Sequence, residues 1–300
     1  MVEEGYAYPN TLVVASDSHA NMYGGVGCLG TPVVRTDAAA IWGTGNTWWQ
    51  VPPVTRVTLH NTLPRGATGK DVIIALCSLF SKDEILNHAL EFDASTETLA
   101  NLSVDDRLSI ANMTTEWGAL SALFPVDRVT LDWLCNHAHT LKKRHGTHGH
   151  PRHSLKALKA LETDSVNRAD PGASYAAQLS LDLASVEPHI AGPNTVKQAS
   201  SLSAISSKNI PIQKAYLVSC VNSRASDLKA AAEVVKGHSV APGVEFYVAA
   251  ASSEVQAESE LTGDWATLLA AGAKPLPAGC GPCIGNPVKT LTCLLLITMF

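Results

Sequence analysis

Three cysteines have the types and spacing to form a metal site: Cys220, which ends AYLVSC, and the pair Cys280 and Cys283 in AGCGPCIG. A structural zinc or a closed iron–sulfur cluster needs four protein ligands. Three thiolates on a cubane leave one iron open, and an open iron can act as a Lewis acid. Two alternatives remain at this point: three buried thiols that pack as small apolar groups, or a thioredoxin-like dithiol.

Two polar groups have the types needed for acid–base chemistry. Asp17-Ser18-His19 follows an apolar run, and an acid, a hydroxyl and an imidazole at a strand end can orient a carboxylate substrate and move protons. The alternative is an Asx-type turn in which Asp17 and Ser18 bind backbone amides. Asn112 and Glu116 are four residues apart, so they share one face of an expected helix, where an ordinary solvated glutamate is the alternative.

Two further patterns favour ordinary structure. The run from Gly25 to Gly30 matches the dinucleotide fingerprint formally, but it does not follow its strand directly, so we interpret it as a chance match. A basic stretch contains six histidines without the helical spacing of a zinc pair, which favours a solvated loop. These histidines are at positions 137, 139, 145, 148, 150 and 153.

Alternating strand and helix patterns surround these residues and predict an α/β fold with parallel strands. We expect strands at 11–16, 54–63, 212–220 and 244–252, and helices at 70–80, 82–92, 105–124, 223–238 and 253–272. Ser226 is the expected N-cap of the fourth of these helices, and glycines 237 and 272 follow the last two. Cys220 would then lie at the carboxyl end of a strand, where open α/β sheets build their sites.

The composition excludes several classes of protein. A net charge of −5 gives no support for nucleic-acid binding, which needs clustered positive charge. Seven cysteines without a small-scaffold spacing indicate reduced thiols in an intracellular protein. We expect no membrane span, because the apolar run at the C-terminus is too short to cross a bilayer, and the acidic N-terminus lacks a targeting pattern.

Several segments together resemble the aconitase superfamily, most closely its fungal homoaconitase branch. The resemblance covers about residues 5–285, except for a weaker part near 136–165. It rests on six matches in the family's order: VVASDSHANMYGGVGCLGTPVVRTDAAAIWGTGNTWWQVPPVTRV, GATGKDVIIALCSLF, LSIANMTTEWGALSALFPVD, LDLASVEPHIAGPN, YLVSCVNSRASDL and PAGCGPCIG.

The resemblance implies a 4Fe-4S cluster whose fourth iron is open to substrate and water. It also implies that the acid–base groups contact or orient the water on that iron and the substrate, and that two asparagines line the cluster pocket. The residues carried over are the ligands Cys220, Cys280 and Cys283, the catalytic residues Asp17, His19 and Glu116, and the substrate-binding residues Ser18, Asn112 and Asn222.

The activity that the resemblance implies is the reversible dehydration of a small hydroxy-tricarboxylate by homoaconitate hydratase, a lyase step of lysine biosynthesis. A monomer in the mitochondrion is implied as well. The alternatives are aconitase, the large subunit of 3-isopropylmalate dehydratase, and a non-enzymatic iron–sulfur or iron-sensing protein. The expected domains are 1–135 with the acid–base residues, a basic connection at 136–174, 175–285 with the cysteines, and a tail at 286–300 unlike the family.

Family members are longer than this sequence. Their N-terminal portion carries another Asp-His pair and a further active-site histidine. Beyond the cluster loop they continue with arginine-rich substrate-binding segments and a mobile C-terminal domain that supplies a serine base. Nothing in this chain matches those parts, so we expect little turnover from the chain alone.

Overall fold

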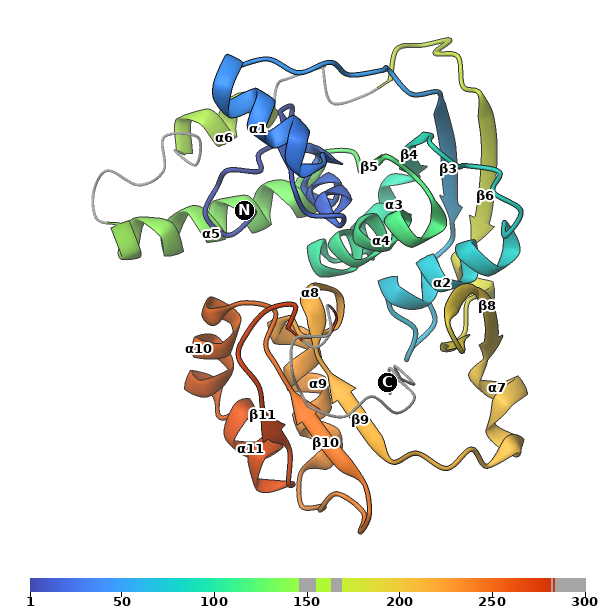
Figure 1. Ribbon diagram of the computed structural model, residues 1–300, viewed down its shortest axis with the longest axis vertical. Coiled ribbons are helices and arrows are strands. Elements are labelled where there is room, and N and C mark those ends of the chain that lie inside the picture. Colours follow the sequence, from blue (N-terminus) through green and yellow to red (C-terminus); the bar gives the residue numbers. More distant parts are fainter. Residues whose placement is uncertain (146–154, 163–168, 282, 284–300) are drawn as a thin grey trace. The chain divides into compact units, whose positions relative to one another are not determined.

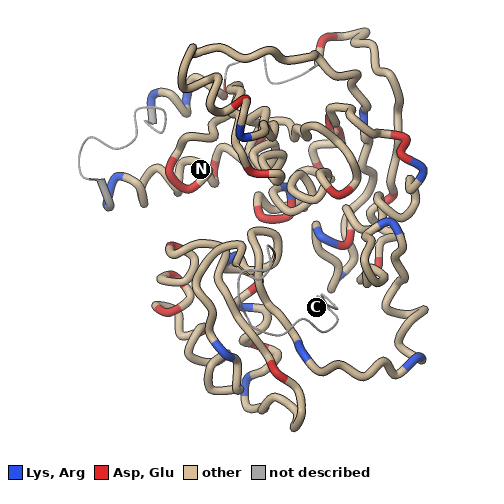
Figure 2. Tube along the Cα trace, in the orientation of Figure 1, with Lys and Arg blue, Asp and Glu red and all other residues tan. Residues whose placement is uncertain are grey.

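The computed structural model describes residues 1–300 except 146–154, 163–168, 282 and 284–300 (Figure 1). The chain separates into two compact units, unit 1 (Met1–Val186) and unit 2 (Glu187–Phe300). Acidic and basic residues are interspersed along the trace of each unit (Figure 2), in keeping with the small net charge. No helix within the described ranges has both the length and the apolar character needed to cross a membrane.

Unit 1 is built on a parallel four-stranded sheet in the order β5-β4-β3-β6, with β1 and β2 forming a separate parallel pair. Its strands are β1 (Leu12–Ala15), β2 (Leu29–Pro32), β3 (Val54–His60), β4 (Ala89–Ala94), β5 (Ser121–Leu123) and β6 (Ala177–Asp182). Its helices are η1 (Ala20–Val26), α1 (Arg35–Thr44), α2 (Gly69–Leu79), α3 (Thr96–Ala100), α4 (Val104–Trp117), α5 (Arg128–His145), α6 (Leu155–Glu162) and η5 (Leu183–Ser185).

The sequence of α4 determines both ends of this helix. Ser103 and Asp106 form a capping box at its start, which satisfies backbone donors that have no helical partner. Trp117 closes it from a fully buried position, where its indole N–H donates to the carbonyl of Phe80 at 2.9 Å. Gly118 then takes the left-handed conformation, with φ 106°, that ends many helices. Glu116 is thus fixed one residue before a buried anchor.

The structure corrects three expectations in unit 1. Residues 82–92 are not a helix: the segment turns and then enters β4, where Leu90 and Phe92 alternate into the core and Phe92 stacks on Phe124 at 4.5 Å. The helix expected to reach residue 124 ends at Trp117, because Gly118 allows the chain to turn into β5. The expected basic connection begins inside α5, which continues to His145.

Unit 2 contains a parallel three-stranded sheet in the order β11-β10-β9 and an antiparallel pair, β7 and β8. Its strands are β7 (His189–Gly192), β8 (Thr195–Ser201), β9 (Lys214–Leu217), β10 (Glu245–Val248) and β11 (Lys274–Pro275). Its helices are α7 (Leu202–Ile205), η6 (Ser206–Lys208), α8 (Ser219–Asn222), α9 (Ala225–Val235), α10 (Ser253–Thr262) and α11 (Asp264–Ala270). The parallel α/β arrangement expected from the sequence is confirmed.

The carboxylate of Glu245 forms ion pairs with both neighbouring strands of this sheet. Glu245 on the central strand β10 lies 2.8 Å from Nζ of Lys274 on β11 and 3.8 Å from Nζ of Lys214 on β9. The hydrogen bond from Lys274, aided by one from Tyr247, lowers the pKa of Glu245 to about 2. The carboxylate therefore stays charged, and bridges both edge strands, over the whole neutral range.

Details of unit 2 also differ from the expectations. The helix expected at 253–272 is two helices, because Gly263 breaks it with φ 85°. The N-cap of α9 is Arg224, paired with Asp227 in the pattern of a capping box, and not Ser226. The chain divides into its two units after Val186, whereas the predicted second domain starts at residue 175. The other predicted domain limits stay predictions. The predicted tail at 286–300 lies outside the described residues.

Candidate active site

Asp17-Ser18-His19 forms the turn between β1 and η1. The backbone N–H of His19 donates to Oδ1 of Asp17 at 3.0 Å, so the Asx-type turn raised as an alternative is present. The turn leaves Asp17 and Ser18 exposed and places His19 at the N-cap of η1. The turn and a chemical role are therefore compatible, because the turn holds the backbone while Nε2 of the imidazole faces Glu116.

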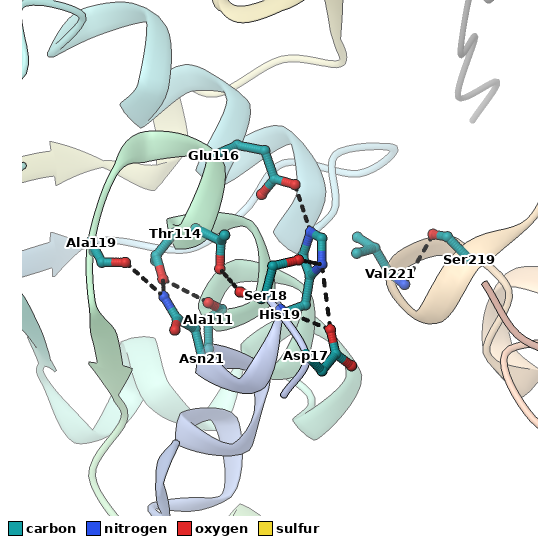
Figure 3. Close-up of polar contacts among 11 residues, drawn as sticks. Asp17, Ser18, His19, Asn21, Ala111, Thr114, Glu116, Ala119, Ser219 and Val221 are labelled. Atoms are coloured by element: carbon teal, nitrogen blue, oxygen red, sulfur yellow. Dashed lines mark hydrogen bonds and ion pairs between the residues drawn. The ribbon is translucent and has the colours of Figure 1, made fainter. Parts of the chain in front are cut away.

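His19 and Glu116 form the central pair of the site (Figure 3). Nε2 of His19 lies 2.6 Å from Oε1 of Glu116, and each side chain keeps 33% of its surface exposed. On the other side of the ring, Nδ1 lies 3.1 Å from Oγ of Ser18 and 3.9 Å from Oδ1 of Asp17. A half-exposed imidazole between a carboxylate and a hydroxyl can hold and pass a proton, so the structure joins four of the predicted residues.

Polar contacts between η1 and α4 hold this pair together. The amide of Asn21, which is fully buried, donates to Oγ1 of Thr114 at 3.0 Å and to the carbonyl of Ala119 at 3.1 Å. Oγ1 of Thr115 donates to the carbonyl of Ser18 at 2.8 Å. Sequence reasoning named neither Asn21 nor Thr115, although both lie within two residues of a residue that it did name.

Asn112 lies one turn before Glu116 on α4 and has no exposed surface. The same-face arrangement expected from the four-residue spacing therefore occurs, but only Glu116 reaches solvent from it. A direct contact between Asn112 and a substrate stays a prediction.

Gly25 and Gly30 of the dinucleotide-like run, and the neighbouring Gly24, serve packing. A Cβ at Gly25 would lie 2.6 Å from the backbone nitrogen of Leu108, and one at Gly24 would lie 1.7 Å from the carbonyl oxygen of Ala122. One at Gly30 would lie 1.9 Å from the carbonyl oxygen of Ala20. These glycines let η1 approach α4, β5 and β2 at backbone distance, which explains their spacing without a nucleotide.

The predicted cysteine ligands lie in unit 2, after strands of one parallel sheet. Cys220 is half-buried in α8, directly after β9, whereas Cys280 and Cys283 follow β11 and are exposed. Gly279 N–H donates to the carbonyl of Ala250 at 2.9 Å, so the loop with this pair is hydrogen-bonded to the segment that follows β10. Among the residues that the structure describes, no three His, Cys, Asp or Glu side chains gather closely enough to hold a metal ion.

The backbone around Cys220 has two unusual features. Ser219 has φ 91°, a region that costs a non-glycine residue on the order of 1–3 kcal/mol, and its Oγ accepts from Val221 N–H at 3.1 Å (Figure 3). Oδ1 of Asn222 is buried without a hydrogen-bond partner among the described residues. Cys220 lies between this strained turn and the unsatisfied amide oxygen, and a thiol in that position is a soft donor that fits an iron–sulfur cluster.

Part of the histidine-rich stretch is helical. His137 stacks on Trp133 within α5 at 5.0 Å, and its Nε2 lies 2.5 Å from the carbonyl oxygen of Glu3. The loop expected there is therefore wrong at positions 137, 139 and 145, because α5 continues through all three of these histidines. The histidines at positions 148, 150 and 153 lie outside the described residues.

Comparison with known proteins identifies the family. Residues 1–292 match the family described as Aconitase family (aconitate hydratase). The chain belongs to the aconitase family. Members of this family use a 4Fe-4S cluster.

Curated members of the aconitase family are highly similar to the chain. It is 61% identical to a protein of Mycosarcoma maydis named "Homoaconitase, mitochondrial" over 97% of the chain, and 60% identical to a protein of the same name from Debaryomyces hansenii over 95%. In both cases the chain spans 40% of the relative's length. A Neurospora crassa protein of that name is 56% identical over 95% of the chain and 38% of its own length.

Among solved structures, aconitase X of Thermococcus kodakaraensis in its holo-form is similar at 12% sequence identity. The match covers 77% of this chain and 44% of that one with a TM-score of 0.38. That likeness is too low to carry an argument about this member of the family.

Proposed function

We propose that the chain is the part of a homoaconitase-type hydro-lyase that carries the cluster ligands and an acid–base pair. The observation that carries this proposal is the identity of 61% over 97% of the chain to the Mycosarcoma maydis homoaconitase. The pairing of His19 with Glu116 across 97 residues supports it, because it brings two proton-carrying groups to one place. The proposed substrate is a small hydroxy-tricarboxylate of the homoisocitrate and cis-homoaconitate type.

The cluster assignment rests on the three cysteines. We propose that Cys220, Cys280 and Cys283 bind a 4Fe-4S cluster, because three soft donors after the strands of one parallel sheet suit it and leave one iron without a protein ligand. When bound, such a cluster supplies a Lewis acid that makes hydroxide a better leaving group.

His19 and Glu116 are proposed to manage the protons of dehydration and hydration. In the neutral imidazole, the 2.6 Å contact favours a proton on Nε2 that is donated to Glu116, while the hydroxyl of Ser18 donates to Nδ1. The pair can then take up a proton at the carboxylate or release one from the ring. Asp17 contributes by holding the turn through the backbone N–H of His19.

Ser18, Asn112 and Asn222 are the proposed substrate-binding residues. Ser18 is exposed, Asn222 is half-buried and Asn112 is buried, so Ser18 is the best placed of the three to meet a ligand directly. The protein is proposed to act as a monomer, and in mitochondria as its curated relatives do.

A chimaera tests the proposed activity. This chain would replace the matching part of the Mycosarcoma maydis homoaconitase, which supplies the remaining length, and the purified, iron-reconstituted protein would be assayed with cis-homoaconitate. We expect hydration by the chimaera and little by the chain alone. Glu116→Gln should lower kcat by about 10²–10⁴-fold, the usual contribution of general acid–base catalysis, whereas Glu233→Gln at an exposed position of α9 should leave it unchanged.

Two outcomes would overturn the proposal. One is a preference for hydration of cis-aconitate or isopropylmaleate over that of cis-homoaconitate. The other is a chimaera that assembles a cluster but hydrates none of these acids, which would favour a non-enzymatic iron–sulfur protein.

A further inference from the structure

Thr115 makes a contact that joins the two halves of the acid–base pair. Its Oγ1 donates to the backbone carbonyl of Ser18 at 2.8 Å, and the next residue on α4, Glu116, contacts the ring of His19 at 2.6 Å. Two successive residues of one helix thus contact two successive residues of the turn after β1. Figure 3 shows the contact between His19 and Glu116 beside the turn that carries Asp17 and Ser18.

The carbonyl that Thr115 binds belongs to the peptide group between Ser18 and His19. The N–H of the same peptide donates to Oδ1 of Asp17 at 3.0 Å. Because a peptide group is planar, binding its C=O from one side and its N–H from the other fixes the orientation of the plane. That plane sets the direction in which the side chain of His19 leaves the backbone.

The part of α4 that carries Thr115 is held in place by buried neighbours. The preceding residue, Thr114, is fully buried and bonds both the carbonyl of Ala111 at 2.7 Å and the amide of Asn21. Trp117 is fully buried on the other side of Glu116. Thr115 therefore extends from a rigid helix end to the exposed turn that carries the imidazole.

We propose that Thr115 is a positioning residue for the His19–Glu116 pair. Its hydroxyl holds the Ser18–His19 peptide so that Nε2 of His19 faces Glu116, and loss of that hydroxyl lets the imidazole turn and exchange its ring proton between Nε2 and Nδ1. The consequence for turnover rests on the proposed function, whereas the effect on the ring does not.

Nitrogen NMR of the histidine rings in the 300-residue chain tests the geometric part. The ring signals of His19 would be identified by their loss in His19→Gln. We expect wild type and Thr115→Ser to hold the proton on Nε2, and Thr115→Val, which removes only the hydroxyl, to shift both ring nitrogens towards the values of a mixed tautomer. An unchanged His19 spectrum in Thr115→Val would overturn the proposal.

Thr267→Val is the matched control, because Oγ1 of Thr267 also donates to a backbone carbonyl, that of Gly263 at 3.0 Å, but in α11. We expect it to leave the ring of His19 unchanged. Should Thr115→Val fail to fold, the ring spectra of Thr115→Ala and Thr115→Ser can be compared instead, because these two variants also differ by the hydroxyl.

Kinetics of the chimaera test the consequence. Thr115→Val should lower kcat roughly 10- to 100-fold, as expected for a misplaced catalytic group, with less than about twofold change in KM, and Thr115→Ser should restore kcat to within about threefold of wild type. An unchanged kcat in an active chimaera would count against the positioning role. An inactive wild-type chimaera with the expected ring spectra would instead overturn the proposed function and leave the geometric inference standing.

Discussion

Arg107, at the start of α4, is the most deeply buried charge in the described part of unit 1. Its guanidinium has no exposed surface and donates to both carboxylate oxygens of Asp127 at 2.7 Å, to Oγ1 of Thr130 at 3.0 Å and to the carbonyl of Leu99 at 2.7 Å. A buried guanidinium is tolerated only with such a set of acceptors. The pair thereby fixes the start of α4, whose other end carries Glu116.

Asp127 should make the stability of the protein depend on pH in the acidic range. Burial acts to raise the pKa of Asp127, but the hydrogen bonds and charge of Arg107 outweigh it and hold that pKa below its usual value. A carboxyl with a lowered folded-state pKa stabilises the protein above its unfolded-state pKa of about 4, and this contribution is lost as pH falls through the folded-state value.

Asp127→Asn should therefore lower the free energy of unfolding by about 3 kcal/mol at pH 7, since it leaves Arg107 buried without its counter-charge. The difference from wild type should shrink below pH ~4. Urea unfolding from pH 7 to 2.5 measures both effects, with the exposed Asp170→Asn as the control. A constant difference across this range would contradict the assignment.

At the scale of elements, the packing of η1 on α4 is what gives the site its shape. Gly25 lies against the backbone of α4, with a Cβ position 2.6 Å from the nitrogen and 2.7 Å from the Cα of Leu108. Backbone atoms cannot move aside as a flexible side chain can. A methyl group at residue 25 must therefore push the two helices apart.

Gly25→Ala should destabilise the protein by about 3 kcal/mol, the upper range for overpacking, and should disturb the ring signals of His19. Gly43→Ala provides the control, because no atom lies within 4 Å of its Cβ position in α1 and alanine favours a helix by about 1 kcal/mol. Urea unfolding of the two variants measures the difference. Equal stability of both variants would show that η1 and α4 are not in backbone contact.

The elements were predictable where one local signal dominated. The alternation of VTRVTLH predicted β3, and the Gly69 start predicted α2, because burial on one face determines each pattern. The helix predicted at residues 82–92 was wrong, because a short apolar run is compatible with both a helix and a strand until its partner strand is known. Thr115 and Asn21 were missed for a related reason: their hydrogen-bond partners are about 95 residues away, and sequence spacing carries no signal for such contacts.

At the scale of the whole molecule, the sequence separates the proposed chemistry between two units. The acid–base pair lies in unit 1 and the three predicted cluster ligands lie in unit 2. Residue types and their order were enough to name the cysteines, the Asp-Ser-His turn and Glu116, because the resemblance to a family assigned a role to each. What the sequence left open is whether and how the three sulfurs come together, because the positions of their loops depend on contacts that local patterning does not show.

Anaerobic reconstitution of the chain with iron and sulfide, followed by metal and sulfide counting and EPR, tests the cluster assignment most directly. We expect equal amounts of iron and sulfide, and a three-iron EPR signal on mild oxidation that disappears when ferrous iron is returned. Serine at Cys220, Cys280 or Cys283 should each abolish this cluster, and Cys135→Ser in α5 should not. A tightly bound zinc, or a cluster that survives loss of any one of those three cysteines, would contradict it.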